Sequence, residues 1–565
     1  MNPTNRKSRH CSNVRQTNSD FKMASSCLSR RQKSVSVLRL TVGLAADRQF
    51  RLDRNVAVTS ALGQFLYDSH VTRCYTVEVK YPNRTSASVK SAIEREVKLT
   101  VGAGFRLPPL KGSPLPAQTL TSVYFDTPDL RLARARITLR HRTQGRRSAW
   151  QLKLPLDCGR REVEVAGSSS TPPPQILDLL FIHLQGGTIR PIARLRTRRT
   201  GMRVGGSRGA EVVLDEVAVL KQSSEVLIFR EVEIERLDGD ASLVDRLEKT
   251  LRKAGAADHD GRPKLFRALD MPAPRQLAPP HANDPAGAHL RYILGHQLDT
   301  ILSRDPGVRL GGESEDVHQM RVATRRMRSV LRVARPLLKS EWEEPLRAKL
   351  GWLGRQLGEA RDLDVQIAYF KGQSESVKPQ DRAAFGRFLE YLQQKRRKVQ
   401  RQLMRDLRRP RYVALINQLI PAVREPAMVP TDKLTIPDLA RKAFRKLRKA
   451  VKELDESATN AKWHHVRIRA KRARYAAELS EWSSGRAATR FIDKIKVIQD
   501  QLGDLQDAVM AEDHLRRFTS KRAGRHSAFL AGQMVERQRQ RRHQAKQAFP
   551  SAWRQVKKCG KQAWC

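Results

Sequence analysis

The sequence predicts an α+β protein of two domains, a β-barrel followed by a helical region, behind a disordered N-terminal extension. Roughly eight strand-like segments between residues 91 and 270 alternate charged and apolar side chains, which is the period of a pleated strand. The second half has helical periodicity and contains an internal repeat. The first 90 residues are rich in Arg, Ser, Asn and Thr and show no clear periodicity, which is typical of disorder.

The net charge of the chain indicates a polyanionic partner. Its 565 residues include 108 Lys and Arg against 58 Asp and Glu, a formal net charge of +50. So large an excess disfavours compactness by self-repulsion, and it suits nucleic acid, an anionic membrane surface or inorganic polyphosphate. Charge alone does not choose among these partners.

The cysteines and the hydropathy pattern predict a cytoplasmic protein. The six cysteines have no C-x-x-C spacing, so a zinc site has little support, and they are too few for a disulfide scaffold. The sequence has no run of about 18 apolar residues and no apolar segment near its start, so we expect neither membrane insertion nor a secretory signal. The acid-poor start resembles an organelle transit peptide, but we favour an extension without function over residues 1–90.

The strand-like region begins with the run at residues 94–98. Glu94, Glu96 and Lys98 alternate with mostly apolar residues, so a strand places two carboxylates and an ammonium on one face. Residues 76–80 match this pattern only in part, because Thr76 replaces the first glutamate. Alone, the pattern is more often a solvated strand, and it becomes informative because later strands carry matching charges.

The segments that follow carry basic or acidic residues on one face, after a β-prone stretch at 121–127 that ends in a turn signal. The basic faces hold Arg140 and Arg142, then Gln151 and Lys153, then Arg194, Arg196 and Arg198. The acidic faces hold Glu162 and Glu164, then Glu211 and Asp215, then Glu231, Glu233 and Glu235. An amphipathic helix is expected at 243–254.

These faces are best explained by a closed barrel with a charged interior. Closure removes the free edges of a sheet and encloses one face of every strand. An interior of charged side chains cannot be a packed core, because unpaired buried charge is too costly, so the interior must hold a ligand. Basic side chains suit phosphate oxygens, and glutamates suit a hard divalent cation such as Mg²⁺ or Mn²⁺.

Residues 91–270 resemble the CYTH domain of the triphosphate tunnel metalloenzymes. The match rests on Glu94-x-Glu96-x-Lys98, Tyr124-Phe125-Asp126-Thr127, Leu139-Arg140-x-Arg142, Trp150-Gln151-Leu152-Lys153, Glu231-x-Glu233-x-Glu235 and Pro263-Lys264-Leu265-Phe266-Arg267. The resemblance implies an antiparallel eight-stranded tunnel that binds a triphosphate and one or two metal ions. The sequence departs from the family in the 90 residues that precede the first motif, and the register at Arg198 and Arg199 stays ambiguous.

The resemblance assigns expected roles to the charged residues. Phosphate oxygens would be gripped by Arg140, Arg142 and Lys153, with Arg196, Arg198 and Arg199 as further candidates, of which one of the last two faces inward. The metal would be held by Glu94, Glu96 and Glu233, with Glu235, Asp215 and Glu211 as lesser contributors. Lys98, Lys264 and Glu231 would be catalytic, by neutralising charge or orienting the attacking water.

The second half of the chain contains two copies of a helical unit, after a Pro-rich linker at 271–287. Residues 317–328 recur as residues 463–474, an offset of 146, and residues 356–362 recur as residues 501–507, an offset of 145. Two segments that repeat in order at nearly one offset indicate duplication. Prolines between residues 421 and 437 separate the halves, 288–420 and 438–545, and residues 546–565 read as a basic tail.

Each copy predicts a helix with one basic face. His318, Arg321, Arg325, Arg328 and Arg332 share one sector of the first helix, and His464, Arg467, Lys471 and Arg474 share one sector of the second. A solvated face normally intersperses acidic residues with basic ones, whereas residues 317–338 and 463–477 contain no acid. A retained anion is the simplest compensation for this repulsion.

This half resembles the CHAD domain, the conserved-histidine α-helical module. The resemblance implies two four-helix bundles whose basic helices bind inorganic polyphosphate, and it extends the expected location to polyphosphate granules. In such a site histidine could donate to phosphate when protonated, or it could be a neutral packing residue.

Together the motifs predict an enzyme that hydrolyses inorganic triphosphate to pyrophosphate and phosphate and binds polyphosphate through its helices. Thiamine triphosphate hydrolysis and class IV adenylate cyclase chemistry share the tunnel and stay open. A polyphosphate-binding scaffold without turnover is the main alternative outside enzymes. Specific nucleic-acid binding has little support, because aromatic residues total 6% and do not alternate with basic ones.

Overall fold

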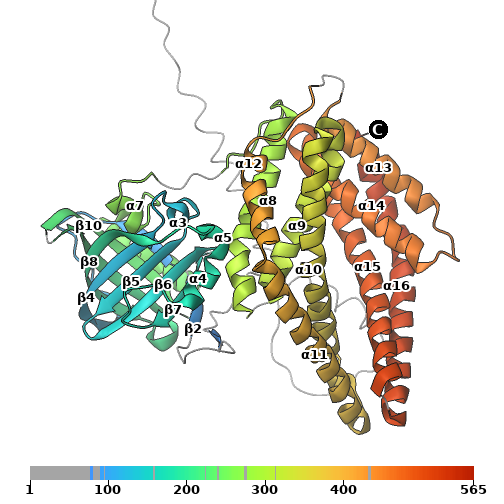
Figure 1. Ribbon diagram of the computed structural model, residues 1–565, viewed down its shortest axis with the longest axis horizontal. Coiled ribbons are helices and arrows are strands. Elements are labelled where there is room, and N and C mark those ends of the chain that lie inside the picture. Colours follow the sequence, from blue (N-terminus) through green and yellow to red (C-terminus); the bar gives the residue numbers. More distant parts are fainter. Residues whose placement is uncertain are drawn as a thin grey trace, which may run out of the picture. The chain divides into compact units, whose positions relative to one another are not determined.

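The computed structural model describes residues 77–79 and 89–564, apart from 95, 157–158, 223, 238–240, 273–276, 312–313, 431–433 and 523. Strands form the first domain and helices the second, as expected (Figure 1). The strands are β1 Val77–Val79, β2 Val89–Glu94, β3 Glu96–Thr100, β4 Gly112–Asp126, β5 Thr138–Gln144, β6 Arg147–Pro155, β7 Arg160–Ala166, β8 Arg190–Val204, β9 Ala210–Lys221, β10 Ser224–Arg236 and β11 Ala257–Asp258.

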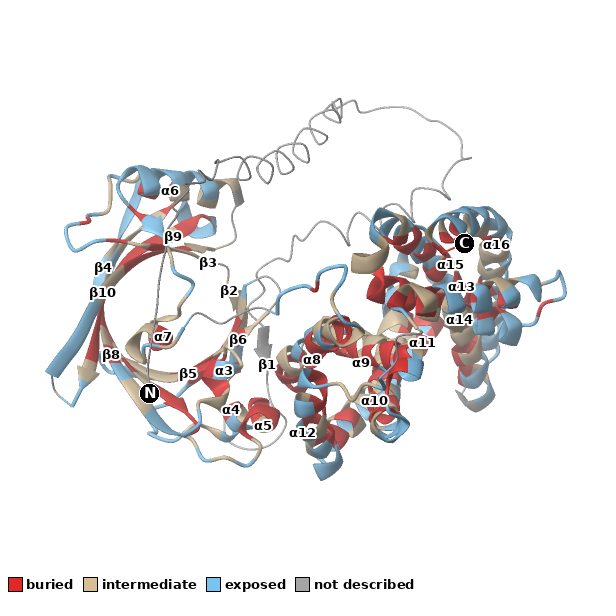
Figure 2. Ribbon diagram, turned by 90° about the horizontal axis from the view of Figure 1, so that it is seen from above, coloured by how far each residue is buried: buried red, intermediate tan, exposed pale blue. Residues whose placement is uncertain are grey.

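The strands form one antiparallel sheet that closes on itself. Their order is β1-β2-β7-β6-β5-β4-β8-β9-β10-β3-β11. Only residue 95 separates β2 from β3, and these two strands pair with β7 and β10, so one stretch of chain joins both ends of the sheet. Figure 2 shows the strands curving round into a ring. The sheet has eleven strands where the sequence predicts eight, because the first strand is divided at residue 95 and β1 and β11 are added outside the ring.

The apolar faces of the strands point outward and are covered by short helices. These helices are α3 Arg131–Arg134, α4 Pro174–Leu179, α5 Phe181–Leu184 and α6 Ala241–Lys253. Helix α7 Lys264–Ala268 lies instead inside the ring, where Leu265 and Phe266 pack against Tyr124, Leu195 and Val217 (Figure 2). One cluster packs Leu139 and Leu152 against Leu179, and a second packs Val232 and Ile234 against Leu251. Because these outer faces are buried against helices, the register of each strand fixes which side chains point into the ring.

The second domain consists of long helices in two matching sets. The first set is α8 Ala286–Leu310, α9 Ser314–Ala334, α10 Ser340–Gly372 and α11 Arg382–Leu407, followed by α12 Pro410–Arg424. The second is α13 Ile436–Lys452, α14 Asn460–Leu479, α15 Glu481–Arg522 and α16 Arg525–Trp564. Short 3₁₀ turns lie at Gly206–Arg208, Arg335–Leu337, Ser374–Ser376 and Pro379–Asp381.

The repeats found in the sequence fall on corresponding helices of the two four-helix bundles. The first repeat lies on α9 and α14, which contact each other, and the second lies on α10 and α15. Each set has its own apolar cluster, around Leu350 in the first and Phe491 in the second. The segment between α12 and α13 marks the predicted division, and α16 continues through the predicted basic tail to Trp564.

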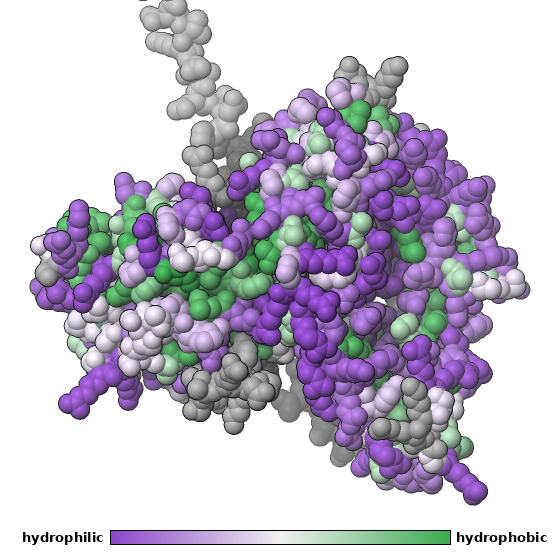
Figure 3. Space-filling model, viewed as in Figure 1, coloured by the Kyte–Doolittle hydropathy of each residue, from purple (hydrophilic) through white to green (hydrophobic). Residues whose placement is uncertain are grey.

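The surface is mostly polar. Figure 3 shows hydrophilic side chains over most of the visible face of the helical domain. Among the described residues, no helix is long and apolar enough to cross a membrane.

Candidate functional sites

The interior of the ring collects charged side chains from all but one of its strands. Cross-strand neighbours share a face, so Glu233 opposite Lys98, Glu235 opposite Glu96, and Glu231 opposite Asp215 all point the same way. The inward set is Glu94, Glu96, Lys98, Arg140, Arg142, Gln151, Lys153, Glu162, Glu164, Arg199, Glu211, Asp215, Glu231, Glu233 and Glu235. Almost all of these positions were predicted from the two-residue period alone.

Three buried carboxylates face three cations in the centre of the interior. Asp215 and Glu231 are fully buried and Glu233 is 7% exposed. The Arg199 guanidinium donates to Asp215 Oδ1 at 2.7 Å and to Glu233 Oε2 at 2.7 Å. Lys264 Nζ, at the first position of α7, lies 3.1 Å from Glu233 Oε1 and also pairs with Asp215. Burial alone would raise the pKa of Glu233, but Lys264, Lys98 and Arg199 hold it well below its usual value.

Glu231 lies among cations without a hydrogen bond. Neither of its oxygens has a hydrogen-bond partner within the described part of the chain. Lys264 Nζ is 3.3 Å from Oε1, and His259 Nε2 and Arg267 Nη1 are 3.6 Å and 3.9 Å from Oε2. His259 and Arg267 were missed as site residues, because one lies in a loop and the other on a one-turn helix, where no strand period applies.

A second part of the interior contains an arginine whose charge no nearby carboxylate neutralises. Arg140 donates to Gln151 Oε1 at 2.8 Å and to the Tyr124 hydroxyl at 3.3 Å, both neutral acceptors. Arg142 forms no ion pair with a described carboxylate, and burial together with Arg140 and Arg199 lowers its pKa to about 10. Arg142 therefore lacks a counter-charge that a bound anion would supply.

A third part of the interior contains more carboxylates than nearby cations can neutralise. Glu94 accepts from Lys153 Nζ at 2.7 Å and 2.6 Å. Burial, followed by the nearby Glu94 carboxylate, raises the pKa of Glu235 to about 7, and Glu162 adds to this effect. Carboxylate oxygens in this number fit a hard divalent cation. In the described residues no three of them converge at ligand distance, and the Lys153 ammonium lies between Glu94 and Glu162.

The basic faces of α9 and α14 form a second site together with Arg361 of α10. Its residues, here called the central site, are His318, Arg321, Arg325, Arg361, Arg467 and Lys471. Burial, followed by Arg325, Arg467 and Arg321, lowers the pKa of Lys471 to about 6. Burial and three neighbouring arginines also lower the pKa of His318 to about 4, so this histidine is neutral at pH 7.

The second sequence repeat makes room for the central site. Its glycines, Gly358 on α10 and Gly503 on α15, lie beside the central arginines. A Cβ atom at Gly358 would lie 3.6 Å from Arg321 Nε, and one at Gly503 would lie 3.8 Å from Arg467 Nη2. Asp362, in the same repeat, accepts from Arg321 at 2.9 Å. The two repeats therefore form one site. The first supplies the basic side chains on α9 and α14, and the second supplies glycines on α10 and α15 that leave space beside them.

Comparison with known proteins agrees with this architecture. The CYTH domain model matches residues 92–262, and the CHAD domain model matches residues 292–516. Uncharacterised proteins from two strains of Mycobacterium tuberculosis are 31% identical over 485 residues, which is 79% of this chain and 92% of each relative. The chain belongs to the CYTH–CHAD family.

Solved structures with a likeness to single parts of this CYTH–CHAD protein are more distant. PptA from Streptomyces chartreusis is 20% identical, with a TM-score of 0.41 over 48% of this chain and 100% of that one. The CHAD domain of the plant Ricinus communis is also 20% identical, with a TM-score of 0.41 over 50% of this chain and 94% of that one. HpAC1 from Hippeastrum, which has a dominant triphosphatase activity, is 18% identical, with a TM-score of 0.23 over 32% of this chain and 96% of that one.

Two of the arginines that were predicted to bind phosphate lie outside the CYTH tunnel. Arg199 points inward, whereas Arg196 and Arg198 lie on the outer face of β8, where they pair with Glu225 and Glu216. The physical reason is strand alternation, because Arg199 lies opposite the inward Asp215 and its neighbour must point away. Glu211 points inward but pairs with Arg203.

The remaining motif residues of the CYTH–CHAD chain have mixed roles. Asp126 accepts from the backbone amides of Leu132 and Ala133 and so holds α3 in place. In the CHAD domain, His464 is exposed and bonded to Gln506 at 2.8 Å, and Arg474 pairs with Glu478 at 2.9 Å. Both were predicted to bind polyphosphate, but neither belongs to the central site as the structure forms it. Arg328 and Arg332 lie further along α9, where they are exposed.

Proposed function

We propose that the CYTH tunnel hydrolyses a linear triphosphate, most favourably inorganic triphosphate, in a reaction that depends on Mg²⁺ or Mn²⁺. The observation that carries this proposal is that one interior holds an arginine, Arg142, and a carboxylate, Glu235, whose charges their neighbours do not compensate. A triphosphate bridged to a divalent cation supplies the missing charge on both sides. A lone anion or a lone cation would correct only one of them.

The inward residues divide into a phosphate group and a metal group. Arg140, Arg142 and Arg199 would hold phosphate oxygens, with Lys153 at the boundary between the groups. The metal would be held by Glu94, Glu96 and Glu235, with Glu162 and Glu233 nearby. The bound metal would polarise the phosphoryl oxygens and neutralise charge that develops on them.

The buried network would orient the reacting groups. Lys98 and Lys264 contact Glu233 and so have fixed positions beside the tunnel. Their ammoniums can stabilise negative charge on the phosphoryl group and on the departing pyrophosphate. Water would attack the terminal phosphorus, the bond to the bridging oxygen would break, and the products would be pyrophosphate and phosphate.

Arg142 offers a test in which function and stability change in opposite directions. Its neighbours disfavour its charge in the free protein, so Arg142→Gln should leave the thermal unfolding midpoint unchanged or raise it. The same change should lower kcat/KM for triphosphate by about 100-fold, the size expected from one lost charge-assisted contact to a reacting phosphoryl group. Arg198→Gln, on the outer face, is the matched control and should change neither quantity. Equal losses of activity in the two variants would rule out the proposed phosphate group.

We propose further that the CHAD domain binds inorganic polyphosphate at the central site. Arg321, Arg325, Arg467 and Lys471 repel one another in a partly buried position, and a polyanion would relieve this repulsion. Arg321→Gln with Arg467→Gln should weaken polyphosphate binding and leave triphosphate hydrolysis intact. If this double variant binds polyphosphate as the parent does, the central site is not the binding site. If the parent binds polyphosphate but releases no phosphate under either metal, the chain is a scaffold.

A further inference from the structure

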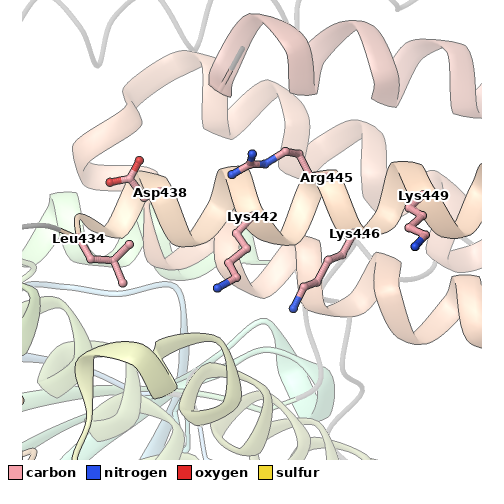
Figure 4. Close-up of a pocket in the computed structure, with 6 residues that line it drawn as sticks. All are labelled: Leu434, Asp438, Lys442, Arg445, Lys446 and Lys449. Carbon is pink, nitrogen blue, oxygen red and sulfur yellow. The ribbon is translucent and has the colours of Figure 1, made fainter.

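Helix α13 carries a dense basic surface that the central site does not include. The helix buries Leu439, Phe444 and Leu447, and four of the cations that it exposes line one hollow. These cations, here called the α13 surface, are Lys442, Arg445, Lys446 and Lys449. They line a hollow of about 630 Å³ together with Leu434 and Asp438, and Figure 4 shows Lys442 and Lys446 extending from the same side of the helix.

The acid next to this surface is already engaged elsewhere. Asp438 is the single acidic residue of α13, and its carboxylate accepts from the Thr435 backbone amide at 3.1 Å in the N-terminal cap of the helix. It also pairs with Arg441 at 2.8 Å. None of the four cations forms an ion pair with a carboxylate of the described residues. Asp438, which also interacts electrostatically with Arg445, is therefore the one carboxylate that faces four cations in this hollow.

Neighbouring helices add cations rather than acids. Helix α13 packs on α14 and contacts α9. The charged groups that act on Lys446 are Lys442 on its own helix, Arg469 and Arg472 on α14, and Arg332 on α9. Burial and four arginines, Arg332 first, lower the pKa of Arg472 to about 10. Unlike the central site, where Asp362 and Asp507 offset part of the charge, this region gathers cations from three helices.

Helix α9 connects the two regions. His318, Arg321 and Arg325 belong to the central site, and Arg328 and Arg332 continue the same face toward α13. His318 and Arg332 are 14 residue steps apart, which is about 21 Å at 1.5 Å per residue. A triphosphate, with two P–O–P links, is too short to occupy both ends of this path, whereas a long linear polyphosphate is not.

We propose that the α13 surface binds the continuation of a long polyphosphate chain that is held at the central site, so that the CHAD domain favours long chains over short ones. This proposal rests on polyphosphate binding at the central site. Lysines suit such a ligand because each ammonium can contact any phosphate along a uniform chain. A single-stranded nucleic acid would gain by stacking on aromatic rings, and none lines this hollow.

The test removes charge from the α13 surface and measures the affinity of the full chain for long-chain polyphosphate at several salt concentrations. We expect Lys442→Ser, Lys446→Ser and Lys449→Ser together to weaken binding about tenfold, the size expected from three exposed ion pairs. The slope of log affinity against log salt should flatten by about 2, from about 0.7 per lost phosphate contact. The thermal unfolding midpoint should stay unchanged, because all three side chains are exposed.

The matched control removes three other exposed lysines of the same domain, Lys371, Lys378 and Lys398, by the same substitution. An equal loss of affinity in both triple variants would show a general effect of net charge and would overturn the proposal. No loss in the α13 variant would overturn it as well. A larger loss for single-stranded DNA than for polyphosphate would assign the surface to nucleic acid instead.

The variant Arg321→Gln with Arg467→Gln distinguishes failure of the α13 surface from failure of polyphosphate binding at the central site. If Arg321→Gln with Arg467→Gln abolishes polyphosphate binding and the α13 triple variant binds normally, only the α13 surface is refuted. If the central double variant binds normally, the central site fails as the anchor and the extension fails with it.

Discussion

The affinity of the CHAD domain for polyphosphate should increase as the pH falls from 8 to 6, because Lys471 must take up a proton. In the free protein, burial and Arg325, Arg467 and Arg321 lower its pKa to about 6, and Asp507 opposes them only in part. A bound polyanion reverses this balance and returns the pKa toward the ordinary lysine value. A pKa that is higher in the bound state means that binding is favoured at low pH and weakens as the pH rises.

The magnitude follows from the protonated fraction of free Lys471. With a pKa of about 6, about half of the free protein carries the charge at pH 6 and about 1% carries it at pH 8, so affinity should fall about 50-fold over this range. His318 is neutral in the free protein over this range, because burial and three arginines lower its pKa to about 4. A bound polyanion returns that pKa toward the ordinary histidine value of about 6.5, so His318 adds to the dependence only near pH 6. The internal phosphates of a long chain remain ionised over the whole range.

Titration of the full chain with long-chain polyphosphate at constant ionic strength measures this dependence. Lys471→Arg keeps the charge and removes the titration, so its affinity should vary by less than about threefold from pH 6 to 8. Lys462→Arg, on the same helix but exposed and paired with Asp455, should keep the parent's dependence. A dependence in Lys471→Arg as steep as the parent's would refute the proton-linked mechanism.

Three further outcomes follow from the structure. Gly503→Val should weaken polyphosphate binding at least tenfold by placing bulk beside Arg467, while Gly532→Val, in open space on α16, should not; equal binding of the two variants in a titration would contradict the role of the glycine. Lys264→Met should lower the free energy of unfolding by about 3–5 kcal/mol because it strands buried carboxylates, as a reduced urea midpoint would show, and an unchanged midpoint would mean that these carboxylates are not ionised. Chelation of divalent cations should abolish phosphate release and leave polyphosphate binding intact, and release that persists with chelator would contradict a metal-dependent tunnel.

The interior of the tunnel could be predicted from sequence because a strand has a period of two residues. Once Glu94, Glu96 and Lys98 share a face, each later strand needs only its own alternation to place its charges. Arg198 and Arg199 could not be separated this way, because the register of β8 depends on its pairing with β9 and on irregularities in its pairing with β4. Contacts distant in sequence decided the orientation.

Residues outside the strands were the hardest to predict. His259 and Arg267 reach Glu231 from a loop and from α7, and their positions follow from the course of the chain across the tunnel rather than from any local period. The sequence repeat contains Gly358 and Gly503, but it does not indicate what they contact. The packing of α9 against α10 and of α14 against α15 places these glycines beside Arg321 and Arg467. The spacing of residues in the sequence predicts which side chains share a face of a strand or helix. Only the packing of the elements shows which residues lie opposite that face.

The most direct test of the central claim is phosphate release from inorganic triphosphate by the intact chain and by Glu94→Gln with Glu96→Gln, each with Mg²⁺ and with Mn²⁺. Both carboxylates face the tunnel beside Lys153 and Lys98. We predict metal-dependent release by the intact chain and loss of that release in the double variant. Release of equal size from both proteins, or none from the intact chain under either metal, would contradict the triphosphatase assignment.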